Sequence, residues 1–221
     1  MNNDITLVTA TSSNHYKSLL QFLRSVPTGI RTIVYDIGLT ETEKETLPCI
    51  CRKFDFSKYP EFIHLSSRDS GAYAWKPCIV YDICQEFGGI VIWCDSGNII
   101  TDIHIIIRST LTCGVYSSIT GGTFAQWTHP SSRSHLPNSR EFLTRPMRNA
   151  ACIGIDWKNS NAQKLIYDWK FFALHKEIIL PVEANRSNHR HDQSILTYLI
   201  YSYQFPLIDE KLGYTIHNDI D

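Results

Sequence analysis

The sequence predicts an α/β protein in which helices flank a mostly parallel central sheet within a single domain. Candidate strands and helices alternate along the first half of the chain, an order that is typical of parallel sheets covered by helices. Residues 90–94 (IVIWC) are all apolar, without the polar alternation of a strand that faces water on one side. We therefore expect them to form a central strand that is covered on both faces.

The composition is that of an ordinary globular protein. Apolar residues make up 43% and charged residues 19% of the 221 residues, a length that is sufficient to bury a core. The 21 basic and 22 acidic side chains give a formal net charge of −1. The overall charge therefore gives no reason to expect a nucleic acid or an anionic membrane as the main partner.

Three features of the sequence indicate a cytoplasmic protein without a transmembrane segment. The N-terminus lacks the basic region and the long apolar stretch of a signal peptide. No apolar run approaches the ~20 residues that are needed to cross a bilayer. The seven cysteines are odd in number and lie mostly in apolar runs, as expected for buried, reduced thiols.

The first half of the chain contains four further candidate strands and several helices. The strands are residues 5–9, 31–37, 50–56 and 62–65. A helix opens near Asn14, and Thr40 and Glu43 have the spacing of a capping box for a second, short helix. Residues 9–13 then lie at the carboxyl end of the first strand, where nucleotides commonly bind in such sheets. A plain connecting loop is the alternative.

A helix, a glycine stop, a buried strand and an acid follow one another between residues 71 and 102. Pro77 is suited to the first helical position, and Gly88 and Gly89 end the helix because glycine enters the left-handed conformation without a Cβ penalty. The buried strand then runs into Asp95. A carboxylate at the end of a core strand is costly to leave desolvated and unpaired. Asp95 is therefore the first candidate site residue, and an aspartate that caps a turn is the alternative.

The second half of the chain begins with a helix through residues 103–111 and a strand at residues 113–119. Residues 121–149 then have the composition of a long loop, and such loops are functional lids or disordered surface segments. Its basic side chains greatly outnumber its single acid, Glu141, and could fold over phosphate groups. They are His129, Arg133, His135, Arg140, Arg145 and Arg148.

The remaining elements are a strand and two helices, at residues 150–156, 162–173 and 195–203. Asp192 lies where the N-cap of the last helix is expected. His189 and His191 alternate around Arg190 in the polar segment before it. No cysteine or further histidine lies nearby at ligand spacing, so a zinc site is disfavoured.

Four segments, taken together, resemble nucleotide-sugar glycosyltransferases of the GT-A type. They are VTATSSNHYKSLL (residues 8–20), VYDIGLT (34–40), YAWKP (73–77) followed by WCDSGN (93–98), and NHRHDQSILTYLI (188–200). The nearest likeness is a family of glycosyltransferase-like domains, and family 8 glycosyltransferases are more distant. The resemblance runs from about residue 5 to residue 205. It implies a single GT-A (Rossmann-like) domain, residues 1–221, with a nucleotide-binding part at about 1–102 and an acceptor-side part at about 103–221.

The resemblance implies that residues near the first two strands hold the nucleoside. Thr9, Ala10 and Tyr16 match the positions of the first-strand loop that do so in such enzymes. Asp36, at the end of the second strand, is a further candidate for the same role.

The resemblance also implies the groups that surround the transferred sugar. Lys76 matches the basic residue that meets the donor's sugar or phosphate, and Arg145 and Arg148 are the further cations available to neutralise a diphosphate leaving group. Asp192 and Gln193 match a DQ pair near the donor sugar and the acceptor. Asp192 would deprotonate an acceptor hydroxyl as a general base, or would orient the sugar and stabilise positive charge. Both roles remain open.

Asp95 matches the first acid of the DxD motif, whose acids commonly bind Mn²⁺ or Mg²⁺ through oxygen atoms. The second acid is replaced by Gly97 in this sequence. Asn98, Asp102 and the late His217 could complete a metal site with Asp95, since His217 resembles a C-terminal histidine that binds metal in family 8. The glycine weakens this metal prediction.

The resemblance predicts an enzyme, a glycosyltransferase, that moves a sugar from a UDP-sugar to a glycan, protein or small-molecule acceptor with help from Mn²⁺ or Mg²⁺. A catalytically degenerate protein that binds a nucleotide sugar is the alternative, suggested by Gly97. A sugar nucleotidyltransferase is disfavoured because residues 9–16 contain no glycine for a phosphate-binding loop.

Overall fold

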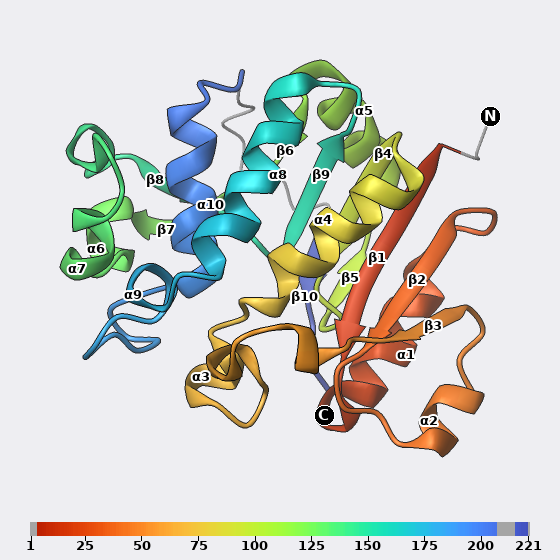
Figure 1. The fold of residues 1–221 in the computed structure, drawn as a ribbon. Helices are drawn as coiled ribbons and strands as arrows, with labels where there is room; N and C mark the ends of the chain where they lie inside the picture. Colours follow the sequence, from red (N-terminus) through yellow and green to blue (C-terminus); the bar gives the residue numbers. More distant parts are fainter. Residues whose placement is uncertain (1–3, 207–214, 221) are drawn as a thin grey trace.

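The computed structural model describes residues 4–206 and 215–220. Its centre is a six-stranded sheet with the strand order β3-β2-β1-β4-β9-β6 (Figure 1). The strands are β1 (Ile5–Thr11), β2 (Arg31–Asp36), β3 (Ile50–Lys53), β4 (Ile90–Cys94), β6 (Val115–Tyr116) and β9 (Cys152–Asp156). The β3-β2-β1-β4 part is parallel, and β9 runs antiparallel to both β4 and β6. The prediction of an α/β protein with a mostly parallel sheet is confirmed.

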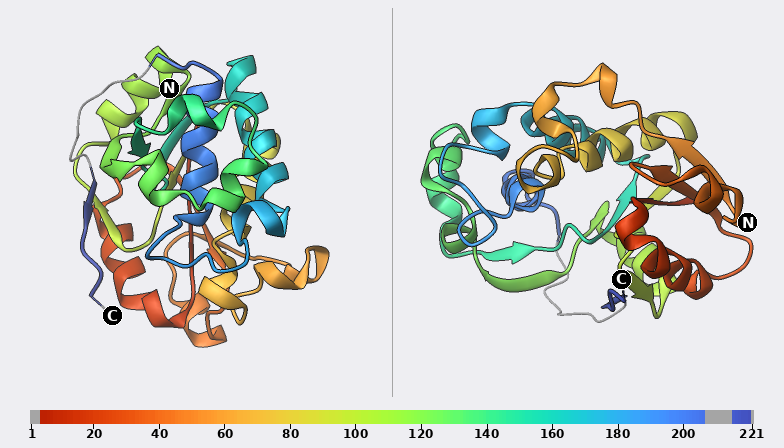
Figure 2. Two further views of the ribbon diagram at one scale, coloured as in Figure 1. Left: turned by 90° about the vertical axis from the view of Figure 1, so that its left-hand side faces the viewer. Right: turned by 90° about the horizontal axis from the view of Figure 1, so that it is seen from below.

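Helices cover both faces of this sheet (Figures 1 and 2). One face carries α4 (Trp75–Phe87), α8 (Ser160–Ala173) and α10 (His191–Ser202), and the other carries α1 (Tyr16–Ser25) and α5 (Ile103–Cys113). Val91 and Trp93 of β4 belong to the first core, whereas Ile90, Ile92 and Cys94 belong to the second. All five residues are buried, so the prediction of a central strand covered on both faces is confirmed.

The remaining elements are short. The short helices are α2 (Glu41–Glu45), α3 (Arg68–Gly71), α6 (Phe124–Trp127), α7 (Pro130–Ser134) and α9 (Lys176–Ile179). Two antiparallel pairs join β5 (Asn98–Ile100) to β10 (Thr215–His217) and β7 (Ile119–Thr123) to β8 (Pro146–Arg148). After β10 the chain passes along α1 (Figure 2), where Ser18 Oγ donates a hydrogen bond of 2.6 Å to Asp219.

Two local predictions are confirmed by the backbone. Thr40 and Glu43 form the capping box of α2. Gly88 and Gly89 end α4 with φ angles of 60° and 62°, and a Cβ on Gly89 would lie 2.3 Å from the carbonyl oxygen of Asp4. Glycine is therefore required there both by conformation and by the close approach of the N-terminal chain.

Two other local predictions are wrong. Residues 62–65 form no strand, because a 3₁₀ helix covers Glu61–Ile63 instead. Residues 121–149 are not one long loop, since they contain part of β7, all of β8, α6, α7 and a further 3₁₀ helix. These helices are too short for an apolar period. Several apolar residues of the segment, among them Phe124, Leu136 and Met147, are nevertheless buried.

The seven cysteines all lie in the described part of the chain and form no disulfide. Five of them are buried, as their apolar neighbours in the sequence predict. Within residues 4–206 and 215–220, no helix combines the length and the apolar character needed to cross a membrane.

Candidate functional site

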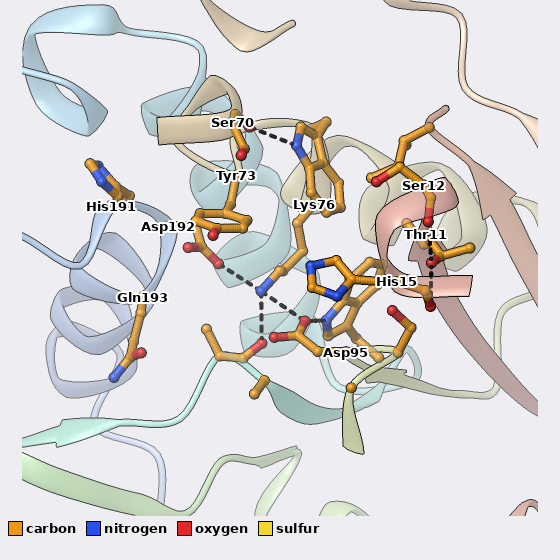
Figure 3. Close-up of a pocket in the computed structure, with 18 of the residues that line it drawn as sticks. Thr11, Ser12, His15, Ser70, Tyr73, Lys76, Asp95, His191, Asp192 and Gln193 are labelled. Carbon is orange, nitrogen blue, oxygen red and sulfur yellow. Dashed lines mark hydrogen bonds and ion pairs between the residues drawn. The ribbon is translucent and has the colours of Figure 1, made fainter. Parts of the chain in front are cut away.

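A pocket of about 480 Å³ opens at the carboxyl ends of β1 and β4 (Figure 3). The two strands are parallel neighbours, so their carboxyl ends reach the same edge of the sheet, where ligands bind in this class of fold. The beginnings of α4 and α10 face this edge, and the C-terminal residues His217 and Asp219 line the pocket beside them. Segments from the whole length of the chain therefore meet in one cavity.

Lys76, near the start of α4, lies at the centre of this pocket. Its ammonium group is 3.0 Å from Asp95 Oδ1, 3.1 Å from Asp192 Oδ2 and 3.2 Å from the carbonyl oxygen of Ala150. Only 4% of Lys76 is exposed. Burial disfavours its charged form, but the Asp192 and Asp95 carboxylates outweigh this effect and raise the pKa of Lys76. Lys76 is thus a fixed cation between two acids.

Asp192 is the buried acid of this triad, with 4% of its surface exposed. Burial raises the pKa of its carboxyl group to about 6, against the opposing effect of the Lys76 ammonium. The prediction that Asp192 caps α10 is wrong, because the helix begins at His191 and its N-cap position makes no side-chain hydrogen bond. The side chain points to Lys76 instead (Figure 3).

Asp95 is the more exposed acid, with 39% of its side chain accessible. Its Oδ1 atom accepts a hydrogen bond of 2.7 Å from Trp93 Nε1 as well as facing Lys76. The turn after β4 is closed by backbone groups, since the amide of Asn98 donates to the carbonyl oxygen of Asp95 over 3.1 Å. The Asp95 carboxylate therefore serves the pocket rather than the turn.

Of the four residues that were predicted to bind the nucleoside, only Ala10 lines the pocket. Ala10 lines the cavity, together with Thr11 and Ser12 of the segment predicted to bind a nucleotide, residues 9–13. Thr9 is fully buried and does not line it. The side chains of a strand alternate between its faces, and it is the last two residues of β1, with Ser12 after them, that reach the cavity.

Tyr16 and Asp36 also lie behind the cavity lining. The Tyr16 hydroxyl forms a hydrogen bond with the Thr46 hydroxyl on the neighbouring loop. The Asp36 carboxylate accepts hydrogen bonds of 2.8 Å and 2.7 Å from the amides of Gly38 and Leu39, which hold the loop after β2. Both side chains therefore support the loops around the pocket rather than face its interior.

Of the remaining predicted residues on the acceptor side, the pocket contains Gln193, whose Nε2 atom donates a hydrogen bond of 3.1 Å to Thr120 Oγ1. Arg145 and Arg148 lie elsewhere, where they line a separate pocket of about 330 Å³ beside α10. Arg148 donates from Nε to the Tyr201 hydroxyl over 3.1 Å. The sequence placed both arginines in a mobile loop, and their attachment to α10 through β8 could not be read from it.

The predicted metal ligands do not form a donor set. Asn98 Nδ2 donates to the carbonyl oxygen of Asp95 over 3.1 Å, and Asp102 caps α5 through the amides of His104 and Ile105. His217 does line the pocket. In the described part of the chain, no three His, Cys, Asp or Glu side chains are grouped so that they could hold a metal ion.

The place of the missing second acid is filled by the C-terminal segment. A Cβ atom on Gly97 would lie 3.3 Å from His217 Cε1 and 3.7 Å from Asp219 Cβ. A side chain at this position would therefore press against the His217 ring. The residues present therefore do not fit the divalent metal that the resemblance implies, and Mn²⁺ or Mg²⁺ stays a prediction without a built site.

His189 and His191 line the pocket as structural side chains. Each ring donates a hydrogen bond of 3.1 Å to the carbonyl oxygen of Ile179. Burial, followed by the neighbouring His191, lowers the pKa of His189 to about 3, so this imidazole is neutral at physiological pH.

Several lining residues were missed from the sequence, among them His15, Ser96, Arg186 and Asp219. Ser96 is adjacent to Asp95, and His15 follows the first-strand loop, so proximity to those motifs could have indicated them. Asp219 carried no signal, because only the pairing of β10 with β5 brings the end of the chain to the pocket.

Comparisons with known proteins agree with this architecture. Residues 1–81 match a family described as "Protein of unknown function (DUF1647)", and no curated protein matches the sequence. Among solved structures, the galactosyltransferase LgtC in complex with donor and acceptor sugar analogs is similar with a TM-score of 0.51 and 16% identity, over 88% of this chain and 70% of that one. An active-site mutant of LgtC gives a TM-score of 0.50 and 15% identity, over 88% and 69%. The chain therefore has the GT-A glycosyltransferase fold of LgtC.

Proposed function

We propose that this protein is a glycosyltransferase that moves a sugar from a nucleotide-diphosphate sugar, a UDP-sugar, to a hydroxyl group of an acceptor. The observation that carries this proposal is the Lys76, Asp95 and Asp192 triad, which lies in a pocket at the carboxyl ends of β1 and β4. The GT-A fold supports it, because the same edge of the sheet is where such folds bind ligands.

The two sides of the pocket suit the two parts of the donor. The nucleoside would lie against the carboxyl end of β1, where Ala10, Thr11 and the following Ser12 line the cavity. Thr9, Tyr16 and Asp36 would support this part from behind. The sugar would lie beside Lys76, at the centre of the pocket, and beside Asp192 and Gln193, which Figure 3 shows on the side away from Thr11 and Ser12.

In the proposed reaction, the acceptor oxygen bonds to the anomeric carbon of the sugar while the bond from that carbon to the diphosphate breaks. The departing UDP gains negative charge, and a nearby cation stabilises it. Lys76 is the cation that the triad holds in place, and no step is assigned to a metal because the described residues offer no donor set. Arg145 and Arg148 lie in the separate pocket and take no part in this proposal.

Asp192 would interact with the sugar or with the acceptor hydroxyl in its ionised form. Its carboxyl group has a pKa of about 6, so it is mostly ionised at neutral pH and still basic enough to accept a proton from the acceptor hydroxyl as the new bond forms. An ionised carboxylate would equally stabilise positive charge on the sugar.

Slow hydrolysis of the donor tests the proposal without knowledge of the acceptor. UDP release from UDP-glucose and UDP-galactose is measured for the wild type, Asp95→Asn and Asp192→Asn, with Glu45→Gln as the control because Glu45 is exposed on α2. We expect each pocket variant to lower the rate by about 10²-fold or more, and the control to leave it unchanged. Equal rates in all four proteins would count against a catalytic triad.

A second function, binding of a nucleotide sugar without catalysis, is favoured by one observation. The C-terminal segment occupies the space of the second DxD acid beside Gly97. In that case a UDP-sugar would raise the melting temperature of the protein, while UDP release would stay at the level of Asp95→Asn. Calorimetric binding and the hydrolysis assay on the same preparation separate the two functions.

A further inference from the structure

Two arginines that lacked any role in the sequence analysis, Arg186 and Arg190, line the same pocket from the segment between α9 and α10. Both side chains are exposed, and each packs against an aromatic ring. The guanidinium of Arg186 is 5.3 Å from the centre of the Tyr73 ring, and that of Arg190 is 4.1 Å from the Trp127 ring. Stacking of this kind restrains the guanidinium plane and leaves its N–H groups available for other partners.

The acids nearest to the reaction centre do not neutralise these arginines. Asp95 and Asp192 both face Lys76, and among the described residues no carboxylate lies within ion-pair distance of Arg186 or Arg190. The part of the pocket edge formed by Arg186 and Arg190, called the rim below, therefore has two positive charges that are not balanced by an acid of the described chain.

The backbone that carries the two arginines is held by hydrogen bonds. The turn that contains Arg186 is closed by the Asn188 side chain, which accepts a hydrogen bond of 2.8 Å from the Asn185 amide. His189 and His191 donate hydrogen bonds to the carbonyl oxygen of Ile179, 3.1 Å each. The amide of Arg190 donates to the carbonyl oxygen of Trp127 over 3.0 Å. The guanidinium groups are thus presented by an ordered segment, and less entropy is lost when a ligand binds them than with free surface arginines.

The position of this rim assigns it to the acceptor. Figure 3 shows His191 and Gln193 on the side of Lys76 opposite to Thr11 and Ser12, the end proposed for the nucleoside. Arg186 packs against Tyr73, which Figure 3 shows on the Asp192 side of Lys76. Arg190 packs against Trp127, whose carbonyl oxygen accepts a hydrogen bond of 2.6 Å from the Ser194 hydroxyl of α10. A group bound there lies beyond the transferred sugar rather than beside the nucleoside.

We propose that the acceptor is an anionic saccharide, whose carboxylate, sulfate or phosphate group is bound by Arg186 and Arg190. This assignment rests on the glycosyltransferase function proposed above and specifies its acceptor. Arginine presents paired N–H donors that match the oxygen atoms of all three anionic groups.

The test uses a matched series of monosaccharide probes: methyl glucoside as the neutral member, methyl glucuronoside, glucose 6-sulfate and glucose 6-phosphate. Their effect on UDP release from UDP-glucose and UDP-galactose is measured for the wild type, Arg186→Gln, Arg190→Gln and the double variant. Arg24→Gln is the control, because Arg24 is exposed on α1 and does not line the pocket. Saturation-transfer NMR measures binding of the same probes without any need for turnover.

We expect at least one anionic probe to bind and to accelerate UDP release about tenfold more than the neutral probe does. Each arginine variant should reduce this preference about tenfold. The preference should weaken as salt is raised from 50 to about 200 mM, since ions screen exposed charges. Probe-independent hydrolysis is measured for the same three arginine variants to report on the donor side of the pocket. The three anionic probes show which group is preferred.

The outcomes separate this assignment from the proposed function. Arginine-dependent binding of an anionic probe without turnover by any protein would retain the anion site and reject the transferase. Turnover with no preference for anionic over neutral probes, or with a preference that survives in the double variant, would retain the transferase and overturn the anionic acceptor. Slower probe-independent hydrolysis in the arginine variants would also overturn it, because the arginines would then serve the donor.

Discussion

Replacing Lys76 with methionine removes the only cation of the triad while keeping a side chain of similar length. Asp192, which is 4% exposed, would then face Asp95 without a counter-charge. Breaking a buried ion pair by removing one partner typically costs 3–5 kcal/mol. The loss of unfolding free energy has an upper limit, because Asp192 can take up a proton instead of remaining charged. A carboxyl group has an ordinary pKa of 3.8, and keeping it neutral at pH 7 costs about 4 kcal/mol. We expect the free energy of unfolding to fall by about 3–4 kcal/mol.

The pH dependence of this loss identifies its cause. In the wild type, the unfolded chain loses the Asp192 proton near pH 3.8 and the folded chain near pH 6. The folded state binds the extra proton between these values, so this contribution to stability falls as pH rises from about 4 to about 6. Without Lys76 the folded-state pKa of Asp192 rises further, and the fall continues to higher pH. The difference between the two proteins should therefore be small at pH 5 and grow toward pH 7.5.

Thermal and urea unfolding at pH 5 and pH 7.5 measure this difference. For a chain of this size, a loss of 3–4 kcal/mol lowers the melting temperature by roughly 6–16 °C. Lys164→Met on α8 is the control, because Lys164 is exposed and should leave stability unchanged. A variant as stable as the wild type, or one that loses the same free energy at both pH values, would refute the buried ion triad.

Three further substitutions test other parts of the structure. The hydrolysis rate of the wild type should rise with pH through about 6 as Asp192 ionises, and Asp192→Asn should lose this acidic limb; a limb that persists would assign it to another group. Gly97→Asp should push the C-terminal segment away from the pocket, since its Cβ alone would lie 3.3 Å from His217; faster carboxypeptidase digestion is expected, and unchanged digestion would contradict this packing. Gly89→Ala should lower the free energy of unfolding by about 1–3 kcal/mol, because the φ angle is 62° and the Cβ would lie 2.3 Å from the Asp4 carbonyl oxygen; a urea curve that matches the wild type would rule out this contact.

The elements that the sequence predicted well are those that local chemistry decides. The capping box of Thr40 and Glu43 and the glycine stop at Gly88 each depend on residues within a few positions. The strand at 90–94 was equally clear, because a short run of only apolar residues is typical of a strand that is buried on both faces. The prediction of a long loop at residues 121–149 was wrong for the opposite reason. The short helices in this segment depend on packing partners elsewhere in the chain.

The candidate site shows the same division. Asp95 and Lys76 could be singled out because motifs of neighbouring residues surround them, and the structure places both in the pocket. Arg145 and Arg148 were assigned to it from charge alone, and they line another cavity. Asp192 was singled out through the resemblance of Asp192 and Gln193 to a DQ pair, but its place before the last helix equally suggested a cap, and only the structure shows that its carboxylate faces Lys76.

By itself the sequence determined the alternation of strands and helices, the buried central strand and the acid that follows it, because these features are encoded by residues that are close together in the chain. The tertiary structure alone decided that Lys76 would be enclosed by two carboxylates from different elements, that the C-terminal segment would occupy the space beside Gly97, and that two arginines would stack on aromatic rings at the rim. The physical reason is that ion pairing, burial and stacking depend on distances between segments that are remote in sequence, and the packing of the sheet and helices sets those distances.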